Sequence, residues 1–203
     1  MIILGLDTTG TDCSVSLVDD ARVRGHISRN IGRGHAEVLA GMVSEVFERA
    51  ELKPTDVDRI AVCTGPGSFT GLRVALSFAK GFALPRGLPI VGIDALEVTA
   101  QKLDPDSTSR IAVSQDVRRG EFFYALYENG VPQFPPRVMI KDEMEWHATD
   151  QWVKTVHDAK ADTRILAWLA MDRDPADYPA EPLYSRGPDA KLPGGKTPPA
   201  KNA

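Results

Sequence analysis

One stretch of the sequence decides the fold, Thr64-Gly65-Pro66-Gly67-Ser68-Phe69-Thr70-Gly71-Leu72-Arg73. It connects an apolar strand expected at residues 59–63 to a helix expected from about residue 72. Gly65 and Gly67 permit backbone angles closed to other residues, and Pro66 stiffens the turn. Thr70 is expected to cap the helix, where free N–H groups would suit an anion. The glycines alone are equally typical of a tight turn that binds nothing, and the Lys-Ser/Thr pair of a Walker loop does not follow them.

The chain around this stretch predicts alternating strands and helices. The first hundred residues are expected to form elements in the order β-β-β-α-β-α-β-α. The three opening strands, at residues 2–6, 14–18 and 22–28, are expected to be antiparallel. Their first hairpin is rich in hydroxyl groups and starts with an aspartate, Asp7-Thr8-Thr9-Gly10-Thr11-Asp12. Residues of this composition could hold a phosphate or could simply form the turn.

Two amphipathic helices are predicted beside these strands. The helix at residues 34–52 has one continuous apolar stripe, which includes His35, Leu39, Met42, Val43 and Val46. The helix at residues 72–84 has two apolar faces. One face contains Leu72, Ala75, Leu76, Ala79 and Ala83, and the other contains Val74, Phe78 and Phe82, with Arg73, Ser77 and Lys80 between them. Such a helix must be covered on two sides, by its own sheet and by either the other helix or another protein chain.

Composition narrows the class of protein. The 203-residue chain is 42% hydrophobic and 26% charged, as in ordinary globular proteins. The net charge of −4 argues against a protein that grips nucleic acid through its own surface field. No apolar run reaches the length of a membrane span, and a signal peptide is not expected. Cys13 and Cys63 are expected to be buried, reduced thiols, so a cytoplasmic location without membrane contact is predicted.

A polar, turn-forming segment predicts a domain boundary. It follows residue 103 and separates a domain at 1–103 from a smaller one at 104–191. The opening pattern then recurs as a strand, the hairpin Asp116-Val117-Arg118-Arg119-Gly120 and a second strand, which suggests an internal duplication. A helix is expected at 149–160, and 165–171 could be helix or strand. The tail at 192–203 is expected to be disordered because it is polar and rich in proline.

Several segments together resemble the TsaB (YeaZ) family, a paralogue of the TsaD/Kae1 proteins in the ASKHA (actin/hexokinase/Hsp70) superfamily. They are residues 3–9 with 13–17, 34–39, 65–73, 116–121 and, more thinly, 181–186. The glycine-rich loop is the most specific of them. The resemblance implies an α/β, ribonuclease H-like fold of duplicated ββαβαβα-type domains, the second one reduced.

The resemblance also implies a function. It implies a non-catalytic scaffold subunit for making N6-threonylcarbamoyladenosine (t6A) at position 37 of ANN-decoding tRNAs. The implied partners are a TsaD-like transferase and a TsaE-like ATPase, with tRNA met only through the complex and a homodimer expected for the chain alone. No cofactor is expected for the chain itself, although a nucleotide could sit at the partner interface. The expected interface residues are His35, Leu39, Met42, Val43, Val46, Arg73, Leu76, Ala79, Lys80 and Ala83.

Two rival activities remain open. One is an ATP-dependent small-molecule phosphotransferase of the ASKHA class, in which the glycine-rich loop would close on the nucleotide. The residues resembling a phosphate-binding loop are Asp7, Thr8, Thr9, Gly10, Gly65, Gly67, Ser68, Thr70, Gly71, Arg118 and Arg119. The other rival is a metal-dependent peptidase. The catalytic paralogue holds metal with a His-x-x-x-His pair, whereas His35 is followed four residues later by Leu39, so neither a metal site nor a catalytic residue is expected.

Overall fold

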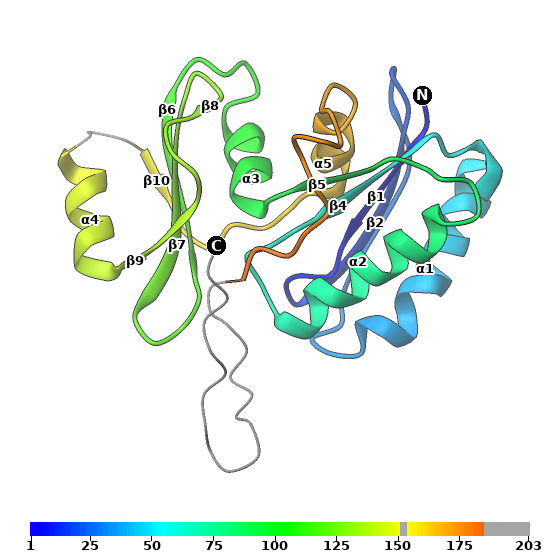
Figure 1. Ribbon diagram of the computed structural model, residues 1–203, viewed down its shortest axis with the longest axis horizontal. Coiled ribbons are helices and arrows are strands. Elements are labelled where there is room, and N and C mark those ends of the chain that lie inside the picture. Colours follow the sequence, from blue (N-terminus) through cyan, green and yellow to red (C-terminus); the bar gives the residue numbers. More distant parts are fainter. Residues whose placement is uncertain (151–153, 185–203) are drawn as a thin grey trace, which may run out of the picture.

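Two β-sheets with helices around them make up the computed structural model, which describes residues 1–150 and 154–184 (Figure 1). The first sheet has the strand order β3-β2-β1-β4-β5. Its strands are β1 (Ile3–Asp7), β2 (Asp12–Val18), β3 (Val23–Asn30), β4 (Arg59–Cys63) and β5 (Ile90–Ile93). The strand β1 pairs antiparallel with β2 and parallel with β4. The β1–β2 hairpin therefore meets the end of β4, where the glycine-rich loop begins.

Three helices complete the first half, and the expected order β-β-β-α-β-α-β-α is confirmed. They are α1 (His35–Ala50), α2 (Phe69–Ala83) and α3 (Ala95–Leu103), with a short 3-10 turn, η1 (Pro54–Asp56), after α1. The helix α2 begins earlier than expected, and its cap is Ser68, whose hydroxyl accepts a hydrogen bond from the N–H of Gly71. The prediction of Thr70 as the cap is wrong, because Thr70 lies in the first turn.

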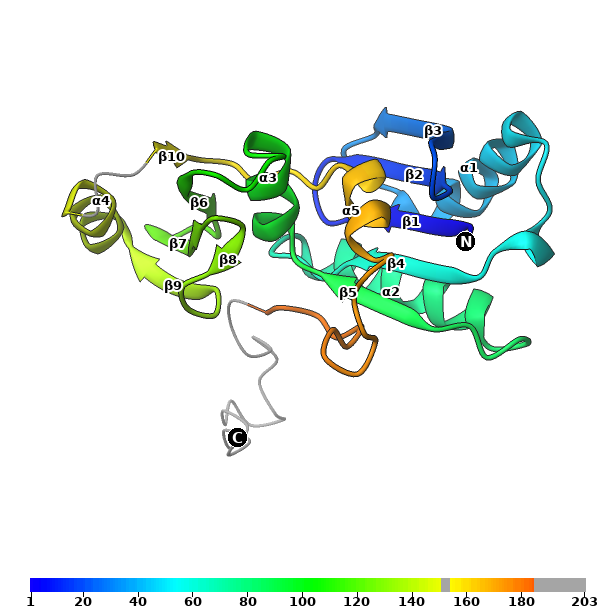
Figure 2. The ribbon, with the colours of Figure 1, turned by 90° about the horizontal axis from the view of Figure 1, so that it is seen from above.

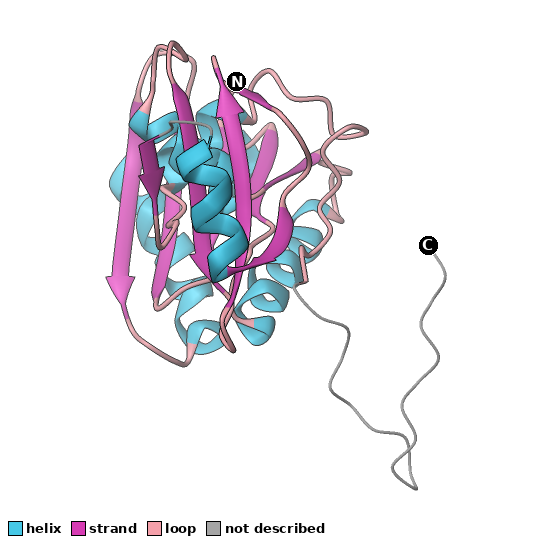
Figure 3. Ribbon diagram, turned by 90° about the vertical axis from the view of Figure 1, so that its left-hand side faces the viewer, coloured by secondary structure: helices cyan, strands magenta, loops and turns pink. Residues whose placement is uncertain are grey.

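The second sheet repeats the opening topology of the first. It contains β6 (Arg110–Asp116), β7 (Glu121–Glu128), β8 (Val131–Pro132), β9 (Arg137–Ile140) and β10 (Lys154–Val156), and α4 (Lys141–Asp150) follows β9. The strand β6 pairs antiparallel with β7 and parallel with β10, as β1 does with β2 and β4. Figure 3 looks onto this side of the molecule, with α4 in front of the second sheet. The helix expected at 149–160 is wrong, since α4 ends at Asp150 and β10 follows.

The two halves share one hydrophobic core. The helix α3 lies between the sheets, and α5 (Thr163–Leu169) returns to cover the face of the first sheet opposite α1 and α2 (Figure 2). One buried cluster joins Ile93 of β5 and Leu96 of α3 to Val113 of β6 and Leu166 of α5. The chain after β10 thus packs on the first sheet, so the expected domain at 104–191 is not one spatial unit. The tail expected at 192–203 lies outside the described residues.

After α5 and a turn at residues 174–177, residues 178–184 run along the first sheet, and we call them the strap. The guanidinium of Arg59 holds its approach by donating to the carbonyls of Met171 and Arg173 at 3.1 and 2.9 Å. The N–H of Gly92 then donates to the carbonyl of Tyr178 at 2.9 Å. A side chain at Gly92 would collide with the carbonyl of Pro179, so glycine is needed for the strap to approach β5. No helix in the described parts of the chain is long and apolar enough to cross a membrane.

Candidate functional site

The glycine-rich loop is bonded directly to the β1–β2 hairpin. The hydroxyl of Thr8 is buried, donates to the carbonyl of Gly71 at 2.6 Å and accepts from the N–H of Ala75 at 3.1 Å. The N–H of Ser68 donates to the carbonyl of Thr9 at 2.8 Å. The structure thus brings together four residues of the expected phosphate loop, but as partners of one another. Donors that could face a phosphate instead hold the hairpin against α2.

Two glycines of the loop allow this close contact. A Cβ at Gly67 would lie 2.5 Å from the carbonyl oxygen of Thr9, and a Cβ at Gly71 would overlap that of Thr8. Gly65 has a φ of 106°, as expected, whereas Gly67 is not among the residues with positive φ. The expectation of an unusual backbone angle at Gly67 is therefore wrong. Its role, like that of Gly71, is to admit the backbone of the hairpin, which occupies the space beside the loop.

Asp7 stabilises the turn of the β1–β2 hairpin through its side chain. Its carboxylate is buried and accepts the N–H of Thr9 at 2.9 Å. Burial raises the pKa of Asp7 above its ordinary value, and the hydrogen bond from Thr9 opposes that shift. Burial also raises the pKa of the Cys63 thiol, 3.8 Å from the hydroxyl of Thr9. Both cysteines are free and buried, as expected. Gly10 and Thr70 are exposed at the edges of this contact.

Arg118 and Arg119 lie in the other half of the molecule. They form the turn between β6 and β7, with left-handed φ angles of 71° and 61°. The N–H of Arg118 donates to the carboxylate of Asp116 at 2.5 Å, which fixes the turn. The two arginines belong to a hairpin of the second sheet, whereas the glycine-rich loop contacts a hairpin of the first sheet. Among residues 1–150 and 154–184, no group of three histidine, cysteine, aspartate or glutamate side chains could hold a metal ion.

Most of the expected interface residues lie inside the core. The structure buries His35, Leu39, Met42, Val43, Val46, Leu76, Ala79 and Ala83 to 9% exposure or less. Because most of these side chains pack in the core between the helices and the first sheet, little of their surface is left for a partner. Leu39 also lines the groove described next, and the place of these residues at an interface stays a prediction. Arg73 and Lys80 are exposed. An apolar stripe has the same spacing whether the helix packs on its own sheet or on another protein, so the sequence could not distinguish the two.

The exposed parts of α1 and α2 form a groove of about 610 Å³. It is lined by Ala36, Leu39, Phe69, Thr70, Arg73, Val74, Ser77 and Phe78. The helix α1 covers only part of the second apolar face of α2. The ring of Phe82 stacks on that of Phe47 in α1, with ring centres 6.2 Å apart. Val74 and Phe78 stay half-buried, and Phe69 is 46% exposed. The groove is therefore apolar, with one cationic side chain.

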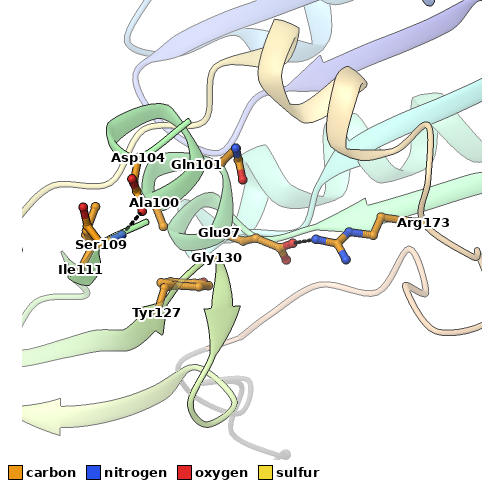
Figure 4. A pocket seen from close by; sticks show the side chains of 9 residues that line it. All are labelled: Glu97, Ala100, Gln101, Asp104, Ser109, Ile111, Tyr127, Gly130 and Arg173. Atoms are coloured by element: carbon orange, nitrogen blue, oxygen red, sulfur yellow. Dashed lines mark hydrogen bonds and ion pairs between the residues drawn. The ribbon is translucent and has the colours of Figure 1, made fainter. Parts of the chain in front are cut away.

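A second group of ionisable residues lies where α3 meets the segment that follows α5. Asp94 caps α3, accepting the N–H groups of Leu96 and Glu97 at 2.9 Å, and burial raises the pKa of Asp94 to about 7. Burial also raises the pKa of Glu97, against the effect of Arg173 at 2.8 Å (Figure 4). The sequence indicated the cap but not the ion pair, because its partners are 76 residues apart.

Comparison with known proteins now places the chain. A family model described as tRNA N6-adenosine threonylcarbamoyltransferase, TsaD, matches residues 17–135, more than half of the chain. The tRNA threonylcarbamoyladenosine biosynthesis protein TsaB of Escherichia coli K12 is 35% identical over 135 residues, covering 64% of this chain. The chain belongs to the TsaB (YeaZ) family. The solved structure of YeaZ from Pseudomonas aeruginosa matches 90% of the chain and 99% of its own, with a TM-score of 0.73 and 25% identity.

The TsaB relatives are longer than the matched region. The chain covers 58% of the length of Escherichia coli TsaB and 53% of that of Haemophilus influenzae TsaB, which is 31% identical over 126 residues. The YeaZ structure nevertheless matches across both sheets, so the expected ASKHA-type fold is confirmed.

Proposed function

We propose that the chain is a non-catalytic scaffold subunit in the formation of t6A at position 37 of ANN-decoding tRNAs. In this proposal it binds and activates a TsaD-like transferase, and a TsaE-like ATPase joins the complex. The names of the TsaB relatives and the TsaD family model support the pathway. The observation that carries the scaffold role is the contact between the glycine-rich loop and the hairpin, together with the open groove on α1 and α2.

The loop contact argues against turnover. Transfer of a carbamoyl group from an adenylate needs donors that hold phosphate and carbonyl oxygens as charge develops. Here the N–H groups of Ser68 and Ala75 already bond to Thr9 and Thr8. Opening the loop for a nucleotide would leave buried polar groups unpaired, at about 1–3 kcal/mol each. The proposal therefore assigns the chemistry to the partner.

The groove supports a docking role. Exposed apolar patches on soluble proteins mark interaction sites, and Phe69 and Phe78 sit where two helices leave a hollow. We assign this groove to a helix of the TsaD-like transferase. The homodimer proposed for the chain alone would use the same surface, so the two assemblies would compete.

Reconstitution of tRNA modification tests the proposal. The other subunits and substrates of the pathway would be incubated with tRNA, with and without this chain, and t6A would be measured by mass spectrometry of digested nucleosides. Modification is expected only when the chain is present, and none from the chain alone. Ser77→Arg, which places bulk and charge in the groove, should abolish the effect, whereas Thr149→Arg on exposed α4 should not. Full modification without the chain would refute the scaffold role.

The rival phosphotransferase is tested by calorimetry with ATP and Mg²⁺. The proposal expects no tight binding to the isolated chain. Micromolar binding, lost in a Thr8→Val variant that remains folded, would favour the rival, because Thr8 stands where the loop would have to open.

A further inference from the structure

One arginine on the rim of the groove is held by two aromatic rings. The guanidinium carbon of Arg73 lies 3.9 Å from the ring centre of Phe69. Its Nε donates to the hydroxyl of Tyr184 at 3.2 Å, and the rings of Phe69 and Tyr184 are 5.2 Å apart. Tyr184 is 111 residues away in the sequence, so the end of the strap supplies one side of this arrangement.

The backbone of the strap fixes the position of Tyr184. The N–H of Leu183 donates to the carbonyl of Thr64 at the end of β4, at 2.8 Å. The carbonyl of Tyr178 accepts the N–H of Gly92 in β5. Both bonds join the strap to strands β4 and β5 of the first sheet, which are largely buried. Tyr184 is therefore presented to Arg73 by the core, although its own side chain is 37% exposed.

Unlike five arginines of the described chain, Arg73 has no acidic partner among residues 1–150 and 154–184. Arg24, Arg29, Arg49, Arg164 and Arg173 each form an ion pair with an aspartate or glutamate. No ion pair is found for Arg73 within residues 1–150 and 154–184. A guanidinium has five N–H donors, and the Nε–H is the one that Tyr184 takes. The Nη groups remain to bind an anion in a side chain that is already held in one place.

We propose that Arg73 binds a carboxylate of the partner protein, carried on the helix that enters the groove, and that Tyr184 positions Arg73 for it. The proposal rests on the docking role proposed above. The groove lining selects a protein carboxylate over a phosphate of tRNA. Its other walls are mainly apolar, as suits an amphipathic helix, whereas nucleic acid binding needs several cations and the chain has a net charge of −4.

Fixing the guanidinium makes the contact stronger and more specific. A long, mobile side chain loses rotamer freedom when it forms an ion pair, which is why exposed pairs contribute little. Stacking on Phe69 and the bond to Tyr184 remove that freedom before binding. The planar fork can then form two parallel bonds to one carboxylate, which a lysine cannot do.

Affinity measurements with the purified TsaD-like protein test this proposal. Arg73→Ala is expected to weaken binding by ~10-fold or more, as for loss of hydrogen bonds to a charged group, and to reduce its salt dependence. Arg73→Lys should recover only part of the loss. Tyr184→Phe keeps the ring but removes the acceptor, and should weaken binding by ~3- to 10-fold without changing the melting temperature. Arg22→Ala, in the exposed turn between β2 and β3, makes the same charge change away from the groove and should have no effect.

A double-mutant cycle identifies the carboxylate. Each exposed aspartate or glutamate on the partner's docking helices would be changed to its amide and combined with Arg73→Ala. One acid is expected to lose its effect when Arg73 is absent. If Arg73→Ala binds as tightly as the unchanged chain while Ser77→Arg does not bind, the groove docks the partner and the carboxylate proposal is overturned. If Arg73→Ala loses affinity for tRNA but not for the partner, the anion is a phosphate and the proposal is also overturned. Failure of the unchanged chain to bind the partner would instead refute the docking role itself.

Discussion

Replacing Gly71 with alanine tests the contact between the glycine-rich loop and the hairpin most directly. Gly71 lies in the first turn of α2, where alanine would normally stabilise a helix by up to about 1 kcal/mol. Here the added Cβ would overlap the carbonyl oxygen of Thr8 and lie 3.1 Å from its carbonyl carbon. The added Cβ is fixed to the backbone of α2, and the atoms that it meets belong to the backbone of Thr8, so neither group can rotate away. The hairpin and the start of α2 must therefore separate.

The structure gives the size of the expected effect. Separation strains the two buried hydrogen bonds of the Thr8 hydroxyl, to Gly71 at 2.6 Å and from Ala75 at 3.1 Å. Each such bond contributes about 1 kcal/mol net, and overpacking adds roughly 1–3 kcal/mol. After the gain in helix propensity, we expect a loss of about 2–4 kcal/mol in the free energy of unfolding. For a chain of this length that corresponds to a fall of roughly 5–15 °C in melting temperature.

Gly81→Ala is the matched control. Gly81 lies in the same helix, and a Cβ there would meet nothing within 4 Å. The same chemical change should raise the free energy of unfolding by about 0.5–1 kcal/mol. Urea denaturation followed by circular dichroism measures both variants. The reasoning is refuted if Gly71→Ala proves as stable as Gly81→Ala, because the hairpin would then not press on α2.

Three further predictions concern stability. Because burial raises the pKa of Asp94 from 3.8 to about 7, the folded chain holds a proton there that the unfolded chain releases. That stabilisation is complete below pH 4 and is lost as the pH rises through 7, by on the order of 2–4 kcal/mol. Asp94→Asn should flatten the dependence of the free energy of unfolding on pH, measured by urea titrations. An unchanged dependence in this variant would contradict the prediction. Ala79→Asp buries a charge in the core and should unfold the chain rather than only block association, as near-UV circular dichroism would show. Ser68→Ala should cost about 1 kcal/mol as loss of a cap, and an equal cost for Thr70→Ala in the same melting experiment would argue against the assignment of the cap.

Local patterns predicted the first half of the fold well. The order of strands and helices follows from apolar spacing, which each segment carries by itself. The cap of α2 was misplaced because Ser68 and Thr70 are both good caps, and only the true start of the helix chooses between them. In the second half, the residue pattern at 149–160 predicts a helix and does not reveal the short strand β10. These residues form a strand because they pair with β6.

The candidate site needed long-range information. The apolar stripe containing Met42 and Val46 predicted burial but not which surface would cover it. The contact of Arg73 with Tyr184 joins residues 111 positions apart, so no local pattern contains it. The sequence groups the hydroxyl-rich hairpin with the glycine-rich loop as residues that resemble a phosphate-binding loop. What the sequence could not tell is that the hairpin fills the space that the loop surrounds.

The helices α3 and α5 each lie against the sheet of the other half, and this exchange has a mechanical consequence. Kinases close on their ligands by rotating one domain against another about a hinge. Rotation of one half against the other in this molecule would expose Leu96 and Leu166, which are buried in one apolar cluster with residues of both sheets. The two halves should therefore move as one rigid body. It would influence a partner by holding that partner's shape, and not by passing on a movement of its own.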